Sequence, residues 1–198
     1  MSSDPYREQF PGYPRQNSGG PPRFLVELLQ TVLLALVLYI GVSLVTDRVR
    51  VENISMQPTL YENDLLLVNK IVYELREPTY GEVVIFHHTH NPPEDYIKRV
   101  IGLPGDTVLV ADGVVRVNGV PLNEPYLKEL PTYEGTWVVP DDSLFVLGDN
   151  RNMSSDSRVW GFVPMEELVG RADLIYWPPE KARLLLPRDI VRAAEHME

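Results

Sequence analysis

One segment of the chain is too long and too apolar to lie on the surface of a small water-soluble domain. Residues 24–45 are apolar apart from Glu27, Gln30 and a few small or hydroxyl residues. No charged residue occurs between positions 31 and 45. A helix of about 22 residues is roughly 33 Å long, close to the thickness of the hydrocarbon layer of a membrane. The pattern therefore predicts a transmembrane helix over residues 24–45.

Two alternatives to a membrane helix remain at this point. Gly41-Val-Ser43 is a small-x-small triplet of the kind found at signal peptide cleavage sites, but the apolar segment is longer than the usual 7 to 15 residues or so. A buried core helix is the other alternative. Three arginines precede the segment and two follow it closely. This small difference gives only a weak indication, by the positive-inside rule, of which end of the helix faces the cytoplasm.

The residues on either side of this segment differ in composition. Residues 1–23 are rich in Pro, Gly, Ser, Gln and Arg and show no apolar period, so we expect a disordered tail. Residues 46–198 are long enough for one globular domain and contain many short apolar runs of strand length. The runs predict strands at 64–69, 82–86, 137–140, 143–148 and 171–177.

Turn residues support an antiparallel β architecture. Residues 108–117 are predicted to form a hairpin, because Asp112-Gly113 tolerates positive φ at both central positions of a tight turn. Pro164 and Gly170 favour a short helix between them. Short strands with closely spaced turns predict a mainly β domain, an antiparallel sandwich or barrel.

Charge and cysteine content exclude some classes of partner. The formal net charge is −10, which argues against nucleic acid, since binding of phosphates needs clustered Lys and Arg. The chain has no cysteine, so disulfides and thiolate metal sites are excluded. For the same reason, the sequence does not indicate whether the protein works in an oxidising or a reducing compartment.

Two residues of the domain could together form a catalytic pair. Ser55 precedes Pro58, which fixes φ and holds the serine near a turn; alone, such a serine is more often a turn residue. Strand alternation places Lys98 on the same face as Tyr96 and Val100, where a solvated lysine is the simpler interpretation. To act as a base near neutral pH, the lysine pKa must fall by about 2 to 3 from about 10.4, which burial among apolar groups achieves.

A third segment, residues 147–164, is dense in hydroxyls, amides and charges. Asp149 is a candidate partner for Arg99, and Asp156 for Arg158, because residues two apart in an extended chain point the same way. We interpret these carboxylates as structural, since an aspartate touching Lys98 would stabilise its charged form.

Four segments together, in this order behind an apolar helix, carry a family resemblance. They are Ser55–Leu60, Gly81–Phe86, Tyr96–Asp106 and Gly148–Pro164. In them the chain resembles the bacterial type I signal peptidases, membrane-anchored Ser/Lys endopeptidases that remove signal peptides from exported proteins. The resemblance covers about residues 24–178 and outweighs the simpler interpretations of Ser55 and Lys98.

The resemblance implies roles for individual residues. Ser55 is expected to be the nucleophile, with its own N–H as one oxyanion donor, and Lys98 the general base. Ser154 is expected to orient the lysine amine. The residues expected to line pockets for small substrate side chains are Met56, Tyr96 and Ile97.

The resemblance also implies an arrangement in the cell. We expect a cytoplasmic tail at 1–23, a single pass through the bacterial inner membrane at 24–45, and an extracytoplasmic catalytic domain at 46–198. The expected substrates are preproteins with small residues before the cleavage site, and no cofactor is needed. Residues 107–146 are expected to form only a short β-hairpin insertion.

The chain departs from the family pattern in two places. Asn53 stands where the family often has a hydroxyl residue as second oxyanion donor, and we hypothesise that its amide N–H fills that role. Asn152 and Met153 stand where an acidic and a polar residue are common, which bears on local hydrogen bonding rather than on the dyad.

The histidines are weaker candidates. His87, His88 and His90 follow one predicted strand, but neighbouring histidines on a strand rarely converge on one ion, so we expect no metal site. A Ser-His triad is given equally little weight. Two rival functions remain: a self-cleaving Ser/Lys regulator, which would need a DNA-binding domain, and a catalytically silent membrane-anchored β domain.

Overall fold

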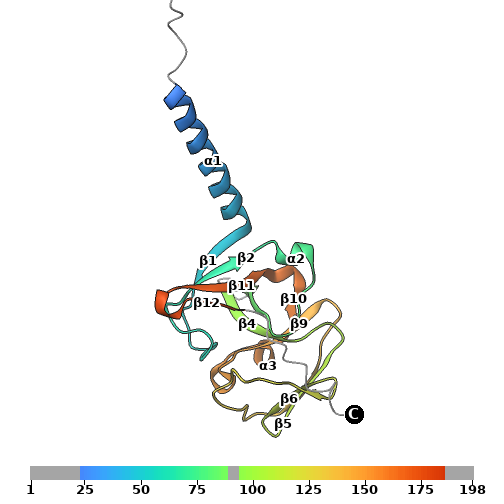
Figure 1. The fold of residues 1–198 in the computed structure, drawn as a ribbon. Helices are drawn as coiled ribbons and strands as arrows, with labels where there is room; N and C mark the ends of the chain where they lie inside the picture. Colours follow the sequence, from blue (N-terminus) through green and yellow to red (C-terminus); the bar gives the residue numbers. More distant parts are fainter. Residues whose placement is uncertain (1–22, 89–93, 186–198) are drawn as a thin grey trace, which may run out of the picture. The chain divides into compact units, whose positions relative to one another are not determined.

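The computed structural model describes residues 23–88 and 94–185. Its first element is helix α1, Arg23–Val45 (Figure 1). The helix is long and apolar enough to cross a membrane, and its large apolar side chains are exposed. It begins one residue before the expected start and ends at the expected residue. Residues 1–22 of the expected tail lie outside the described residues.

Eight of the strands that follow in the described residues form one antiparallel sheet. The strand order is β1-β2-β11-β3-β4-β9-β10, and β12 also pairs with β11. Its strands are β1 (Thr46–Arg50), β2 (Leu65–Asn69), β3 (Val83–His88), β4 (Glu94–Gly102), β9 (Ser143–Leu147), β10 (Val163–Pro164), β11 (Leu168–Trp177) and β12 (Arg183–Leu184). The expected mainly β, antiparallel fold is confirmed.

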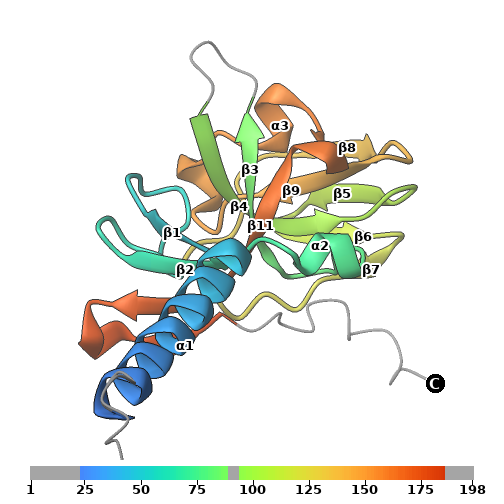
Figure 2. The ribbon, with the colours of Figure 1, turned by 90° about the horizontal axis from the view of Figure 1, so that it is seen from above.

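A second, four-stranded sheet has the order β7-β6-β5-β8. Its strands are β5 (Thr107–Ala111), β6 (Val114–Val117), β7 (Val120–Pro121) and β8 (Gly135–Val138). The predicted hairpin is present, with φ of 52° at Asp112 and 75° at Gly113. Figure 1 and Figure 2 show this sheet on the opposite side of the β domain from β1 and β2.

Strand β4 lies at the junction of three apolar clusters. Ile101 packs with Val108 and Phe145 between the two sheets. Val100, the neighbour of Ile101, packs with Val84 in a second cluster on the other face. A third cluster holds β2, β3 and β11 together. Since burying one such side chain contributes roughly 1.5–3 kcal/mol, β4 is held firmly on both faces.

The prediction of a short helix between Pro164 and Gly170 is wrong. Pro164 belongs to β10, a three-residue 3-10 turn (η2, Met165–Glu167) follows, and β11 already begins at residue 168. Gly170 lies inside β11, where an added Cβ would lie 2.4 Å from the carbonyl oxygen of Asn69. The glycine therefore permits close approach of two strands and does not end a helix.

Several short elements had no sequence prediction, strand β1 among them. The helical turns are α2 (Val72–Leu75), η1 (Arg151–Met153), α3 (Ser157–Trp160) and η3 (Pro179–Lys181). Each has at most four residues, too few to show the apolar period by which a helix is recognised.

Candidate active site

Ser55 and Lys98, 43 residues apart in sequence, meet inside the β domain. The amine Nζ of Lys98 lies 3.0 Å from the hydroxyl Oγ of Ser55, within hydrogen-bonding distance. Both residues are buried, with exposures of 7% for Ser55 and 3% for Lys98. The two candidates from sequence are thus in direct contact and shielded from water.

The sheet positions Lys98. It pairs in register with the fully buried Val84 of β3, and its neighbour Arg99 pairs with Leu147 of β9 on the other side. The alternation argument expected a solvated lysine, and that simpler interpretation is wrong for this position. From residue 98 onward both faces of β4 are covered, so alternation no longer separates buried from exposed side chains.

Burial changes the acidity of this lysine. Desolvation of the ammonium lowers the pKa of Lys98 to about 8, although the carboxylates of Asp156 and Asp149 partly oppose the shift. Neither carboxylate is a hydrogen-bond partner of the amine, whose contacts are Ser55 Oγ and the carbonyl oxygen of Ile97, both at 3.0 Å. A lysine of this pKa is neutral in a useful fraction of molecules near neutral pH.

The loop that carries Ser55 is tightly folded. Gln57 N donates to the carbonyl of Ile54, and Leu60 N donates to that of Met56, at 3.1 and 2.9 Å. Met56 and Leu60 are buried in the core at 1% and 0% exposure. These two buried side chains anchor the turn that follows the serine in the core.

Asn53 contacts Ser55 as a hydrogen-bond acceptor. Its side-chain oxygen Oδ1 accepts from the Ser55 hydroxyl at 2.7 Å and from the Ser55 backbone N–H at 3.2 Å. Since the serine hydroxyl donates to Asn53, Lys98 Nζ donates to the serine oxygen in this arrangement. In this geometry Asn53 offers no N–H to an oxyanion, so its expected donor role stays a prediction.

Ser154 is close to the loop that carries Ser55, but its hydroxyl makes no hydrogen bond to the lysine amine. Its Oγ is buried and, within residues 23–88 and 94–185, has no hydrogen-bond partner. A Cβ added to Gly148 would lie 2.2 Å from Ser154 Oγ and 2.5 Å from the carbonyl oxygen of Ser55. Gly148 therefore lets the two serines approach each other, a role that sequence reasoning missed although the residue lay in a quoted motif. The lysine-orienting role of Ser154 stays a prediction.

A groove opens beside Ser55 on the side of Asn53. It has a volume of about 330 Å³, and its walls come from β1, the start of the loop that carries Ser55 and the first half of β4. Met56, Tyr96 and Ile97, the predicted pocket residues, all line it. Residues 94–97 pair with β3 on one edge, whereas β9 pairs only from Arg99 onward. The edge of β4 along the groove is therefore open.

Comparison with known proteins places the chain in a family. The family model for signal peptidase, peptidase S26, matches residues 25–177. The chain belongs to this signal peptidase family. A probable signal peptidase I-2 from Synechocystis sp. is 45% identical over 178 residues, which cover 86% of this chain and 82% of the relative. Signal peptidase I of Leptolyngbya laminosa is 41% identical over 195 residues, or 94% and 96% of the two chains.

A solved structure was also matched. A crystal structure of a signal peptidase I from Enterococcus faecalis is 34% identical, covers 48% of this chain and 97% of that chain, and gives a TM-score of 0.44. The family model and the curated relatives confirm the predicted family and the enzyme class, signal peptidase I.

Two ion pairs involve residues next to Lys98 or in the polar segment 147–164. Arg99 donates to both carboxylate oxygens of Asp149, at 2.7 and 2.6 Å, and also to Thr59 of the loop that carries Ser55 at 3.3 Å. Asp156 accepts from Arg158 at 2.6 Å and from the N–H of Gly148 at 3.0 Å. Both carboxylates are thus engaged by arginines.

The histidines lie at the end of the β3–β4 hairpin. His87 pairs with Asp95 at 2.6 Å on the exposed surface, and His88 stacks on the ring of Tyr96. His90 lies outside the described residues. Among residues 23–88 and 94–185, no group of three His, Cys, Asp or Glu side chains could hold a metal ion.

Proposed function

We propose that the chain is a membrane-anchored serine endopeptidase that cleaves N-terminal signal peptides with Ser55 as nucleophile and Lys98 as general base. The observation that carries the proposal is the 3.0 Å contact between Lys98 Nζ and Ser55 Oγ in a buried site. Membership of the signal peptidase family supplies the reaction class, and the geometry supports the assignment of these two residues to it.

The reaction is acyl transfer. Neutral Lys98 accepts the hydroxyl proton as Ser55 Oγ bonds to the scissile carbonyl carbon, and the resulting ammonium gives that proton to the leaving amine as the C–N bond breaks. Water then attacks the ester, with Lys98 again as base, and Ser55 is released. The pKa of about 8 suits a group that must both accept and return a proton.

The oxyanion must take the place that Asn53 Oδ1 now occupies on the axis of the Ser55 N–H. Rotation of the Asn53 side chain away from Ser55 would free this backbone donor and allow the side-chain NH₂ to donate to the oxyanion. Asn53→Ala is therefore expected to lower turnover about 10²- to 10³-fold on a preprotein, the usual loss for one oxyanion donor. Unchanged turnover with an intact fold would remove Asn53 from the mechanism.

The substrate is expected to bind as an extended strand in the groove along the open edge of β4. Backbone groups of residues 94–97 would pair with the peptide, and alternate side chains would enter hollows bordered by Met56, Tyr96 and Ile97. Side walls made of large residues leave room only for small substrate side chains. This fits preproteins with small residues before the cleavage site.

Helix α1 is proposed as the anchor that keeps the site at the membrane surface. Its length, roughly 35 Å for 23 residues, suits a single pass through a bilayer. The proposed location is the bacterial inner membrane, with the catalytic domain on its outer face and the tail inside. Protease treatment of sealed inverted vesicles tests this: the domain should be protected, and digestion of the domain would contradict the orientation.

The dyad assignment is tested by assay of Ser55→Ala in detergent on a preprotein. Loss of cleavage, with the thermal unfolding midpoint unchanged, is the expected result. Cleavage at the wild-type rate would show that another group is the nucleophile. Absence of cleavage by both forms would favour a binding module over an enzyme.

A further inference from the structure

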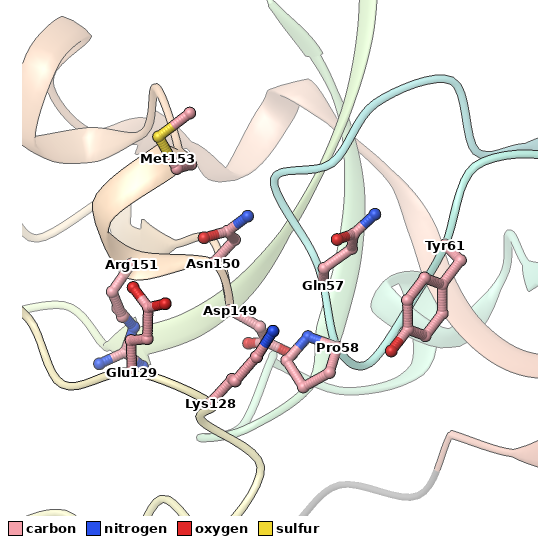
Figure 3. Close-up of a pocket in the computed structure, with 9 residues that line it drawn as sticks. All are labelled: Gln57, Pro58, Tyr61, Lys128, Glu129, Asp149, Asn150, Arg151 and Met153. Atoms are coloured by element: carbon pink, nitrogen blue, oxygen red, sulfur yellow. The ribbon is translucent and has the colours of Figure 1, made fainter.

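A second hollow borders the nucleophile loop, and no step above uses it. It has a volume of about 240 Å³ and is shown in Figure 3. Gln57 and Pro58 line it, whereas Asn53 and Met56, earlier in the same loop, line the substrate groove. The loop around Ser55 therefore borders both hollows, with different residues turned to each.

The far wall of the second hollow is also tied to the nucleophile. Asn150 lines it, and the backbone N–H of Asn150 donates to the carbonyl oxygen of Ser55 at 2.9 Å. Its side chain donates to the carbonyl of Ile54 at 3.2 Å. One residue of the hollow's wall is thus hydrogen-bonded directly to the backbone of Ser55.

The lining of this hollow is polar, and its charges fall into two groups. Asp149 and Arg151 are buried and already paired, with Arg99 and Glu124 respectively. Lys128 and Glu129 are exposed, and no ion pair of either appears among residues 23–88 and 94–185.

Figure 3 shows the Lys128 side chain extending from its loop into the space bordered by Gln57, Pro58 and Asn150. The hollow therefore presents one ammonium and one carboxylate, with amide groups beside them. These two charged groups are available to a ligand.

An endopeptidase must also hold the chain that follows the cleaved bond. If the segment before the bond occupies the groove on the Asn53 side, the segment after it must leave on the other side of Ser55. Two extended residues span about 7 Å, enough to carry their side chains into the second hollow. Its volume, smaller than that of a typical drug-sized site, suits one or two side chains.

We propose that this hollow binds the first two residues after the cleaved bond, and that Lys128 and Glu129 set which charged side chains are accepted there. The proposal rests on the Ser55-dependent cleavage described above. Lys128 attracts an acidic side chain at these positions, and Glu129 attracts a basic one. The residues after the cleaved bond are the first residues of the exported protein. The hollow therefore selects among exported proteins by their first residues, and not by their signal peptides.

The test uses the full chain in detergent and two preproteins that differ only in Asp or Lys at the second position after the cleaved bond. The measured quantity is the ratio of kcat/KM for the Asp substrate to that for the Lys substrate. Lys128→Glu should lower this ratio and Glu129→Lys should raise it, each about two- to fivefold, as expected for one partly exposed ion pair. The neutral variants Lys128→Met and Glu129→Gln should give smaller shifts in the same directions.

Matched controls exclude a general effect of net charge. Lys70→Glu and Glu74→Lys make the same charge changes on exposed residues that line a different hollow, and they should leave the ratio unmoved. Raising the salt to about 1 M should shrink the shifts at 128 and 129, because charges are then screened beyond roughly 3 Å.

Two results would overturn the proposal. One is a ratio that stays at the wild-type value in both charge reversals, and the other is a shift equal to that of the controls. In either case, cleavage that still depends on Ser55 would leave the proposed function standing. Cleavage that survives Ser55→Ala would instead refute the function itself.

Discussion

Lys98 and Arg99 are neighbours on β4 and are almost equally buried, at 3% and 2% exposure, yet their surroundings differ. Arg99 meets a carboxylate: although burial opposes it, Asp149 raises the pKa of the guanidinium. Lys98 meets a hydroxyl and a carbonyl, and burial lowers the pKa of its amine to about 8. The strand therefore carries a fixed charge paired with a carboxylate at residue 99 and a titratable amine hydrogen-bonded to neutral groups at residue 98.

The strongest way to break this contrast is to give position 98 a group that cannot lose its proton. Lys98→Arg keeps the positive charge, but a guanidinium does not deprotonate in proteins. We expect kcat/KM on a preprotein to fall by about 10³-fold or more, similar to Lys98→Ala, since a general base contributes about 10²–10⁴-fold. Retention of a tenth of the wild-type activity by Lys98→Arg would contradict a base role.

The opposite change removes the partner of the fixed charge. Arg99→Met leaves Asp149 buried without a cation, which costs about 3–5 kcal/mol of unfolding free energy for a broken buried pair. Denaturant unfolding of the purified protein measures this. Replacing both residues, as in Arg99→Met with Asp149→Leu, should recover part of the loss. If Arg99→Met unfolds like the wild type, the ion pair does not stabilise the fold.

A smaller effect is expected from a change beside the dyad that alters no charge. Gly148→Ala places a methyl group 2.2 Å from Ser154 Oγ and 2.5 Å from Ser55 O, so the nucleophile loop must shift. Displacement of a reacting group by about 1 Å costs about 10²-fold, so we expect kcat/KM to fall 10- to 100-fold. Gly41→Ala, which meets nothing within 4 Å, is the control. Equal activity of the two variants would show that the site tolerates the shift.

Sequence patterns predicted the parts of this structure that depend on local chemistry. The apolar helix, the Asp112-Gly113 turn and the antiparallel strands all follow from residue preferences over a few positions. Pairing Ser55 with Lys98 needed the ordered motifs of a family. Alternation alone placed Lys98 in solvent, because residues that bury it, Ser55 among them, are distant in sequence.

Other features required the three-dimensional contacts. Gly170 resembled a helix stop in the sequence. In the structure a glycine is needed there because the carbonyl of Asn69 on a neighbouring strand leaves no room for a Cβ. The acceptor geometry of Asn53 and the absence of a Lys98 contact to Ser154 depend on side-chain rotation, which no sequence pattern encodes. The hollow at Lys128 and Glu129 is lined by three segments distant in sequence, so no local sequence pattern predicts it.

The pH dependence of kcat/KM tests the central claim most directly, because it reports the ionisation of the free enzyme's base. The measurement covers about pH 6 to pH 10 with a preprotein whose own groups do not titrate there. The neutral amine is the active form, so activity should rise about tenfold per unit of pH at the acid end and level off above a midpoint of about 8. A midpoint near 10.4, the value of an unperturbed lysine, or a profile without this ionisation would contradict Lys98 as the base.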